Sequence, residues 1–384
     1  MINLPSRSAP PRRRGGLRVD LVLVAAALLA AAIGVVMVYS ATRGPLTAAG
    51  TSPTYYMKRQ ALFVLLGVVV MLGLAWLDYR RLESVGYLLW GVSVFLLLAV
   101  MVPGIGSETL GSQRWFRLGP LELQPSEFAV LALIVAVATY CSRRNEGLAW
   151  RDVARLLVMA GIPIVLVLIQ PDLGTALIMT IVLLVMLAAA GLPNRILLML
   201  VAGAVVVVVV AVEAGFLHHY QITRITSFLH QDTAHLTKLQ KTEIYNLTQA
   251  KSAIGSGGLF GKGLLRGAQT NLGYVPEQRT DFIFSAVGEQ LGFVGATAVL
   301  AVLAVVAWRV LRAGQVSRDS FGRLLCTGVF TFLAFSIFQN AGMNMGIMPI
   351  TGIPLPFISY GGTAVIAFFM GVGLALSVFA RRNA

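Results

Sequence analysis

The sequence predicts an all-α membrane protein that crosses the bilayer many times, and three observations support this fold class. The 384 residues are 57% hydrophobic and 12% charged, about half the charged fraction of a typical soluble domain. Apolar runs of about 18 or more residues recur along the chain, and each can span the hydrocarbon core as a helix. Several runs, among them VLVAAALLAAAIGVVMV and VAGAVVVVVVAV, have no polar face, unlike the surface helices of soluble proteins.

The apolar runs predict ten transmembrane helices. Their expected ranges are 20–40, 60–77, 85–103, 125–141, 153–169, 174–190, 196–213, 281–308, 322–341 and 362–380. A long loop, residues 214–280, separates the seventh range from the eighth. Residues 1–19 are expected to form a basic tail, and residues 20–384 to form one membrane domain.

The distribution of basic residues predicts how these helices are oriented. An even number of spans places both ends of the chain on one side. If that side is the cytoplasm, 18 of the 30 Lys and Arg residues lie in the tails and inner loops, and seven of the other twelve lie in the long loop. The positive-inside rule has little force for long loops. We therefore expect both termini in the cytoplasm and the loop 214–280 outside it.

The composition also argues against some partners. A net charge of +14 can indicate nucleic-acid binding, but arginines beside membrane spans contact anionic headgroups, so we expect membrane lipids and no nucleic acid. Cys141 and Cys326 lie near inner helix ends and predict neither a disulfide nor a metal cluster. The first span lacks a small-residue cleavage site and is expected to remain as an anchor.

Three segments expected outside the cytoplasm interrupt the apolar pattern. Residues 104–124 join two spans and combine Gly, Pro, Trp and Arg. Residues 233–255 have leucines at mixed helical spacing, which predicts either an amphipathic helix on the membrane surface or a solvated loop helix. Residues 340–362, NAGMNMGIMPITGIPLPFISYGG, are too rich in Gly and Pro for a continuous helix. They predict a partly re-entrant loop, which is tolerated only where it is buried or lines a cavity.

The glycine-rich stretch GSGGLFGKG, residues 255–263, is not a Walker phosphate loop. Ser256 stands where that motif requires Gly, and Gly263 replaces its Ser or Thr. A flexible turn is the simpler interpretation. Lys262 and Arg266 nevertheless lie close to backbone N–H groups, a combination that suits a diphosphate.

Three acidic residues, Glu127, Asp172 and Asp281, each stand at the outer start of a predicted span. Helix capping is a sufficient explanation for any one of them, because a carboxylate there accepts hydrogen bonds from free N–H groups. Asp281 differs, since Thr280 can already serve as the cap. Ionisable groups at membrane depth are costly and often functional, so Asp281 is the strongest candidate for chemistry. Glu289, about two turns further, is expected to be a structural partner of an arginine.

Four motifs occur here in the order known from the SEDS family (shape, elongation, division and sporulation). They are GSQRWFRLGPLELQPSE (111–127), QPDLGTAL (170–177), VPEQRTDFIFSAVGEQLGF (275–293) and GIMPITGIPLPFISYGG (346–362). The resemblance covers nearly the whole chain and implies a membrane glycosyltransferase that polymerises peptidoglycan from lipid II. The wording VPEQRTDF and the short tails are more similar to the rod-shape-determining, RodA-type members than to the division-type, FtsW-like members.

The resemblance implies a chemical role for each candidate residue. The family transfers a glycan chain from one undecaprenyl diphosphate carrier to the sugar 4-hydroxyl of another lipid II. Inversion at the anomeric carbon requires one base, and Asp281 is expected to be this catalytic base. The expected substrate-binding residues are Arg114, Glu127, Asp172, Lys262, Arg266 and Arg279, the basic ones lying near the leaving diphosphate. A Mg²⁺ or Mn²⁺ held mainly by the substrate phosphates can share this work.

The resemblance also implies a location in the bacterial cytoplasmic membrane and a class B penicillin-binding protein, a transpeptidase, as partner. Two other function classes stay open at this stage. A lipid II flippase or transporter would share the many spans, although transporters usually place their sites near the membrane midplane. A scaffold for other wall enzymes would need no catalytic carboxylate.

Overall fold

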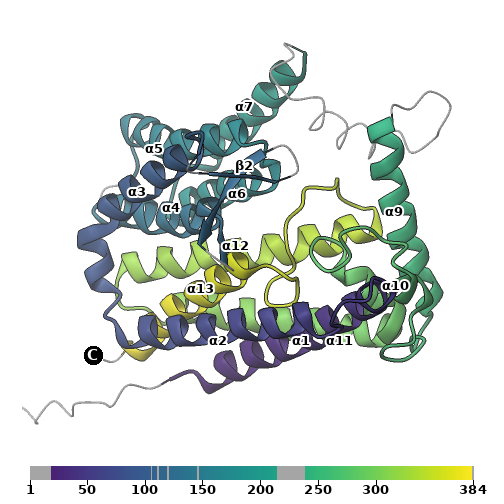
Figure 1. Cartoon of the computed structure of the whole chain (residues 1–384). Helices are drawn as coiled ribbons and strands as arrows, with labels where there is room; N and C mark the ends of the chain where they lie inside the picture. The colour runs from purple at the N-terminus through teal and green to yellow at the C-terminus, as the bar shows by residue number, and fades with distance from the viewer. Residues whose placement is uncertain are drawn as a thin grey trace, which may run out of the picture.

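A computed structural model of the chain describes residues 19–104, 106–109, 112–118, 121–144, 147–213 and 238–382. Long helices run side by side in a bundle (Figure 1). The helices are α1 (Leu21–Ala48), α2 (Tyr55–Trp76), α3 (Arg80–Val100), α4 (Pro125–Ser142), α5 (Trp150–Ile169), α6 (Leu173–Ala189), α7 (Asn194–Glu213), α9 (Lys238–Gly257), α10 (Ala268–Leu272), α11 (Ile283–Gln315), α12 (Ser320–Met345) and α13 (Gly362–Ala380).

Each of the ten predicted ranges overlaps one of these helices. In the described part of the chain, eight helices are long and apolar enough to cross a membrane, namely α1 to α5 and α11 to α13. Two further apolar segments, Leu173–Ala189 and Asn194–Val207, are shorter. The structure therefore confirms a helical protein with multiple membrane-spanning segments, and the count of ten stays a prediction.

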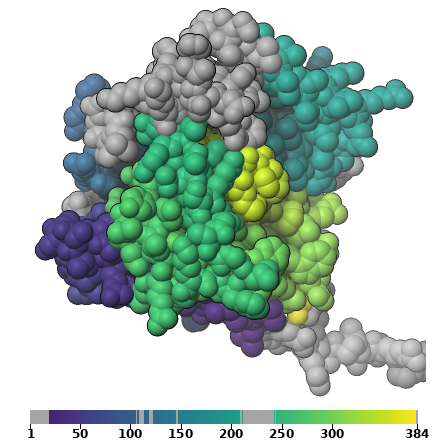
Figure 2. Space-filling view, turned by 90° about the vertical axis from the view of Figure 1, so that its right-hand side faces the viewer, coloured from purple at the N-terminus to yellow at the C-terminus, as the bar shows by residue number. Residues whose placement is uncertain are grey.

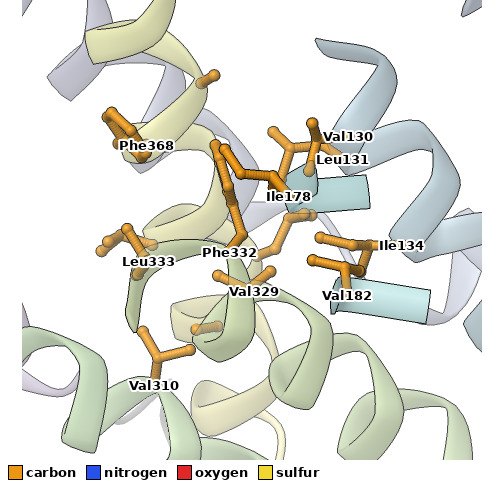
Figure 3. Close-up of a cluster of buried hydrophobic side chains, with 14 of the residues drawn as sticks. Val130, Leu131, Ile134, Ile178, Val182, Val310, Val329, Phe332, Leu333 and Phe368 are labelled. Atoms are coloured by element: carbon orange, nitrogen blue, oxygen red, sulfur yellow. The ribbon is translucent and has the colours of Figure 1, made fainter. Parts of the chain in front are cut away.

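The core lies where α4, α6, α12 and α13 meet (Figure 3). The buried rings of Phe332 and Phe368 stack there with centroids 4.9 Å apart. Lipid tails are as apolar as these side chains, so helix association depends on close packing. Gly328 of α12 shows how close: a Cβ added there would lie 2.5 Å from Cγ2 of Ile134 on α4. A small residue at this position lets the two helices touch.

A small antiparallel sheet follows α3, with strands β1 (Ser107–Thr109), β2 (Ser112–Leu118) and β3 (Leu121–Leu123) in that order. It is tied to α13, because the hydroxyl of Thr363 donates a hydrogen bond of 2.9 Å to the carbonyl oxygen of Glu122. The sequence does not predict this sheet, since β1 and β3 have only three residues each and the longer β2 does not alternate apolar with polar residues.

The segment between α12 and α13 is irregular and buried, as the sequence predicts. Helix α12 ends where Gly346 adopts a φ of +77°, a left-handed conformation that favours glycine. Leu355 and Phe357 in the following loop are fully buried. A Cβ added at Gly34, in the middle of α1, would lie 2.3 Å from the carbonyl oxygen of Phe357. The loop therefore enters the bundle as far as the middle of α1.

Helix α9 lies crosswise at one end of the bundle (Figure 1), and Figure 2 shows it on the face seen from that end. This confirms a helix within the predicted range 233–255, although the start of that range lies outside the described residues. Leu247 and Ala253 of α9 pack with Val275 and Phe282 in a small apolar cluster. The helix is thus attached to the bundle by its apolar side.

Helix α11 is broken at Gly292, which has a φ of +67°. The N–H groups of Phe293 and Val294 donate to the carbonyl oxygens of Gly258 and Leu259, at 2.9 and 3.1 Å. The glycine-rich stretch therefore docks against α11 through backbone hydrogen bonds. It is an ordered turn, where the sequence suggested a flexible one.

Candidate active site

A cavity of about 440 Å³ lies between the sheet, the starts of α4 and α6, the segment before α11 and the loop before α13. Segments far apart in the sequence contribute to its wall. Five of the seven predicted site residues line it: Arg114, Glu127, Asp172, Arg279 and Asp281. Folding thus brings the candidate base and two candidate diphosphate-binding arginines to one place.

Asp281 stands just before α11, and its half-buried side chain lines the cavity. Its backbone carbonyl oxygen accepts hydrogen bonds from the side-chain amides of Asn340 and Asn344 on α12, at 2.9 and 3.1 Å. These asparagines are fully buried. A buried polar side chain is expected to have hydrogen-bond partners, and here the partner is the backbone that carries the candidate base.

The two residues before Asp281 are held in the same way. The carbonyl oxygen of Thr280 accepts a hydrogen bond of 2.6 Å from the hydroxyl of Ser359. The carbonyl oxygen of Arg279 accepts one of 2.8 Å from the N–H of Tyr360. Three successive carbonyl groups are therefore bound by α12 and the loop before α13. A base supported in this way is preorganised, which lowers the entropic cost of reaching the reactive geometry.

Asp172 is a capping residue, as the sequence allowed. Its carboxylate accepts hydrogen bonds from the N–H and the hydroxyl of Thr175 in the first turn of α6, at 3.1 and 2.9 Å. The side chains of Gln124 and Ser126 also donate to it, at 3.1 and 3.3 Å. The carboxylate connects the starts of α4 and α6, so its first effect is to shape the cavity wall.

Glu127 lies in the first turn of α4 and is only 7% exposed. Within the described residues, no group donates a hydrogen bond to its carboxyl group, which lines the cavity. Glu127 therefore offers a carboxyl group to a ligand, whereas the Asp172 carboxylate is already occupied.

The cavity wall carries three arginines. Arg114 donates to the carbonyl oxygen of Pro171 at 2.5 Å, and its Nε has no partner among the described residues. The guanidinium of Arg279 lies 4.4 Å from the centre of the Tyr56 ring, and its Nε also lacks a partner there. Arg59 is the third, and it is not among the site residues predicted from the sequence. Buried guanidinium N–H groups of this kind suit a phosphate ligand.

The charges of the cavity wall indicate whether the site suits a metal ion. The three arginines share the wall with five carboxyl groups, those of Glu122, Glu127, Asp172, Glu277 and Asp281. A diphosphate would add further negative charge to a wall that already has an excess of it. In the part of the chain that is described, no three His, Cys, Asp or Glu side chains cluster as metal ligands. A site of this kind fits a Mg²⁺-like ion held by substrate phosphates with one or two carboxylates.

Lys262 and Arg266 do not line this cavity. The ammonium group of Lys262 lies 3.4 Å from the carboxylate of Glu289. Glu289 is fully buried and also accepts hydrogen bonds from the N–H groups of Gln269 and Thr270, both at 2.9 Å. The partner of Glu289 is thus a lysine and the start of α10, where the sequence suggested an arginine. A substrate-binding role for Lys262 and Arg266 stays a prediction.

Two groups of residues were not identified from the sequence. Arg59 begins the second span, where a basic residue is expected to contact headgroups, so its position carries no distinct signal. Asn340 and Asn344 do carry one, because amides four residues apart share a helix face and stand here in an uncharged apolar run. That signal marks a buried polar contact without revealing what it contacts.

Comparisons with known proteins agree with the motifs. The family model described as "Cell cycle protein" (FtsW, RodA, SpoVE) matches residues 20–384. Stage V sporulation protein E of Bacillus subtilis is 34% identical over 94% of this chain and 96% of its own length. The probable peptidoglycan glycosyltransferase FtsW of Trichlorobacter lovleyi is 35% identical over 94% of this chain and 93% of its own.

Two solved structures are also similar. A chain from the work described as "Structural coordination of polymerization and crosslinking by a peptidoglycan synthase complex" is 30% identical, with a TM-score of 0.78 over 95% of this chain and 99% of that one. The crystal structure of the rod shape determining protein RodA from Thermus thermophilus is 31% identical, with a TM-score of 0.69 over 95% of this chain and 98% of that one.

Proposed function

The chain belongs to the SEDS family of FtsW, RodA and SpoVE, and we propose that it is a peptidoglycan glycosyltransferase that extends glycan strands from lipid II. The names of its relatives and the similar solved structures support this activity. The observation that carries the proposal is the cavity that brings Asp281 together with Arg59, Arg114 and Arg279. A carboxylate beside several guanidinium groups is what a sugar hydroxyl and a diphosphate leaving group require.

The reaction needs one proton acceptor. The 4-hydroxyl oxygen of the acceptor sugar attacks the anomeric carbon of the donor, while the bond from that carbon to the diphosphate oxygen breaks on the opposite face. Asp281 takes the hydroxyl proton as the new glycosidic bond forms. Attack opposite the leaving group inverts the configuration, so no protein nucleophile is needed. The diphosphate leaves as an anion, stabilised by the three arginines.

A divalent cation completes this proposal, because the cavity wall has more carboxyl groups than arginines. Mg²⁺ or Mn²⁺ bound to the diphosphate would neutralise charge on the leaving group. Glu127 is the carboxyl group best placed to help hold such an ion, since no described residue hydrogen-bonds to it. Asp172 acts in this proposal through its hydrogen bonds, by keeping the wall in shape.

We place the cavity on the outer side of the cytoplasmic membrane, with ten spans, both termini in the cytoplasm and the loop 214–280 outside. Residues 20–384 form one membrane domain after the basic tail 1–19. The positions of the ion pairs support this orientation. Five pairs of an arginine with an acidic residue lie at the end of the bundle away from the cavity, and the positive-inside rule expects arginines on the cytoplasmic side. These pairs are Asp20–Arg309, Asp78–Arg381, Glu83–Arg143, Asp152–Arg144 and Asp319–Arg80.

Within the family, we propose the elongation type, which acts in rod shape with a class B penicillin-binding protein as partner. The motif wording of residues 275–282 supports this type. Relatives named FtsW match at similar identity, so the division type is the alternative. Complementation decides: the chain should restore growth as rods to cells depleted of RodA and should not rescue cells depleted of FtsW.

The activity is tested with purified protein, lipid II and the partner in detergent. We expect glycan strands in the presence of Mg²⁺ or Mn²⁺ and a large loss with a chelator. Detergent contains no second membrane leaflet, so polymer formed there separates a polymerase from the flippase alternative. Lipid II left unchanged by well-folded protein with its partner would contradict the proposed function.

A further inference from the structure

A second cavity, of about 360 Å³, lies beside the first. Its wall comes from the end of α1, the start of α2 and residues 272–279. The two cavities share Glu277 and Arg279, which therefore form the partition between them. A turn sets this partition: Glu277 has a φ of +48°, uncommon for a residue other than glycine, and the N–H of Thr280 donates to its carbonyl oxygen at 3.1 Å.

The wall of the second cavity includes a buried polar side chain with an unsatisfied hydrogen-bond acceptor among the described residues. Gln278 is only 5% exposed, and its side-chain nitrogen donates to the hydroxyls of Thr270 and Ser285, at 3.4 and 3.3 Å. Its side-chain oxygen has no partner among the described residues. Buried polar atoms are rarely left without partners. The ligand must therefore be able to donate a hydrogen bond.

Charge and shape narrow the ligand further. Glu277 and Arg279 are the two charged residues of the lining and have opposite signs, so the wall suits an uncharged group. Ala41, Leu46 and Val275 provide an apolar part, and the volume is typical of a small-molecule site. A prenyl chain has no hydrogen-bonding groups to satisfy Gln278. A pyranose sugar has both apolar C–H faces and hydroxyl groups.

We propose that this second cavity binds a sugar of the donor glycan strand, one that lies beyond the bond being broken. The inference rests on the proposed function. The donor's diphosphate lies beside the arginines of the first cavity, and the acceptor hydroxyl lies beside Asp281. The remaining sugars of the donor must leave the first cavity, and the second cavity lies on the other side of Arg279. Binding there would keep a growing strand attached between successive additions.

The test is the length of the glycan strands made from lipid II by the full chain with its partner. Leu46→Trp fills the cavity, and Gln278→Leu removes its amide. Thr47→Trp is the matched control, because Thr47 is exposed and lines neither cavity. Loss of one hydrogen bond to the bound sugar in Gln278→Leu predicts strands about three- to ten-fold shorter, and Leu46→Trp should shorten them at least as much because it excludes the sugar. The first coupling of two lipid II molecules should change less than about two-fold, since its donor is only a disaccharide.

Strands of wild-type length in both cavity variants would overturn the inference while leaving the proposed function intact. A wild-type chain that makes no polymer would instead contradict the proposed function. If a cavity variant is poorly folded, a photoreactive amino acid introduced into the otherwise wild-type chain tests the inference instead. Placed at Leu272, which lines the cavity and is 65% exposed, it should crosslink to a labelled strand, and at Thr47 it should not. Absence of crosslinking at Leu272 would also overturn the inference.

Discussion

Asp281 and Glu289 stand eight residues apart in one motif, yet the structure uses them in different ways. The carboxylate of Glu289 is fully buried and accepts hydrogen bonds from the start of α10 and from Lys262. Around Asp281, the donors from α12 bind the backbone carbonyl oxygen, and the side chain lines the cavity. Glu289 is therefore held through its carboxylate, and α12 holds Asp281 through its backbone carbonyl oxygen.

We propose that this difference separates a structural carboxylate, that of Glu289, from a catalytic one, that of Asp281. Glu289 receives its donors on the carboxylate, which ties α10 to α11. The backbone of Asp281 is held by hydrogen bonds from α12, so that the fold sets its position while its side chain faces the cavity. Substitutions in the two regions should therefore affect different measured quantities, the reaction rate for Asp281 and the stability for Glu289.

The largest expected effect on rate belongs to Asp281→Asn. The amide has nearly the same shape but cannot take the hydroxyl proton, so the rate of polymerisation should fall about 10²- to 10⁴-fold. The melting temperature should stay close to that of the wild type. Initial rates with labelled lipid II and thermal unfolding in detergent measure both. Asp78→Asn is the matched control, because Asp78 pairs with Arg381 and lines neither cavity.

Glu289→Ala should instead reduce stability. It leaves the buried N–H groups of Gln269 and Thr270 without an acceptor and removes the partner of Lys262. The free energy of unfolding should fall by about 2–4 kcal/mol. Activity per folded molecule should change much less than in Asp281→Asn. A loss of activity at unchanged stability would remove the contrast between the two regions.

Asn344→Ala tests the support behind Asp281. It removes one of two amides that bind the Asp281 carbonyl, so kcat should fall about ten-fold while KM for lipid II changes little, because orientation is lost and binding is not. Ser336→Ala on the same helix is the matched control, since its hydroxyl bonds only to Phe332 within α12. A rise in KM with an unaltered kcat would show that Asn344 serves binding.

A smaller effect is expected for Arg59→Ala, which removes one guanidinium from the cavity wall. KM for lipid II should rise about five- to ten-fold, the size expected for one charge-assisted hydrogen bond that is partly compensated by its neighbours. Lys58→Ala is the adjacent control, because Lys58 is exposed and lines neither cavity. Equal values of KM for the two variants would contradict a role for Arg59 at this site.

Much of the fold could be predicted because it depends on local composition. Long apolar runs form helices in a membrane wherever they occur, since each must satisfy its own backbone. The irregular loop before α13 was also predictable from its Gly and Pro content. The sheet of β1 to β3 was not, because short strands depend on contacts with the rest of the chain.

The site was predictable residue by residue but not as an assembly. Asp281 and Arg279 stood out through their motif, whereas the contact of Arg114 with Pro171 links segments more than fifty residues apart and leaves no local pattern. The sequence around Lys262 likewise does not reveal its neighbour in the fold, because its glycine-rich surroundings suit a phosphate and the folded chain also pairs it with Glu289. Charge type alone does not say which partner a basic residue meets.

We propose that the carboxylate of Asp281 acts as the catalytic base and that the carboxylate of Glu289 stabilises the fold. The most direct test measures the initial rate of polymerisation of Asp281→Asn and Glu289→Gln side by side, each divided by the amount of folded protein bound to the partner. We predict that the Asp281 variant is at least about a hundred-fold slower than the Glu289 variant. Equal normalised rates, or a Glu289 variant slower than the Asp281 variant, would contradict the account.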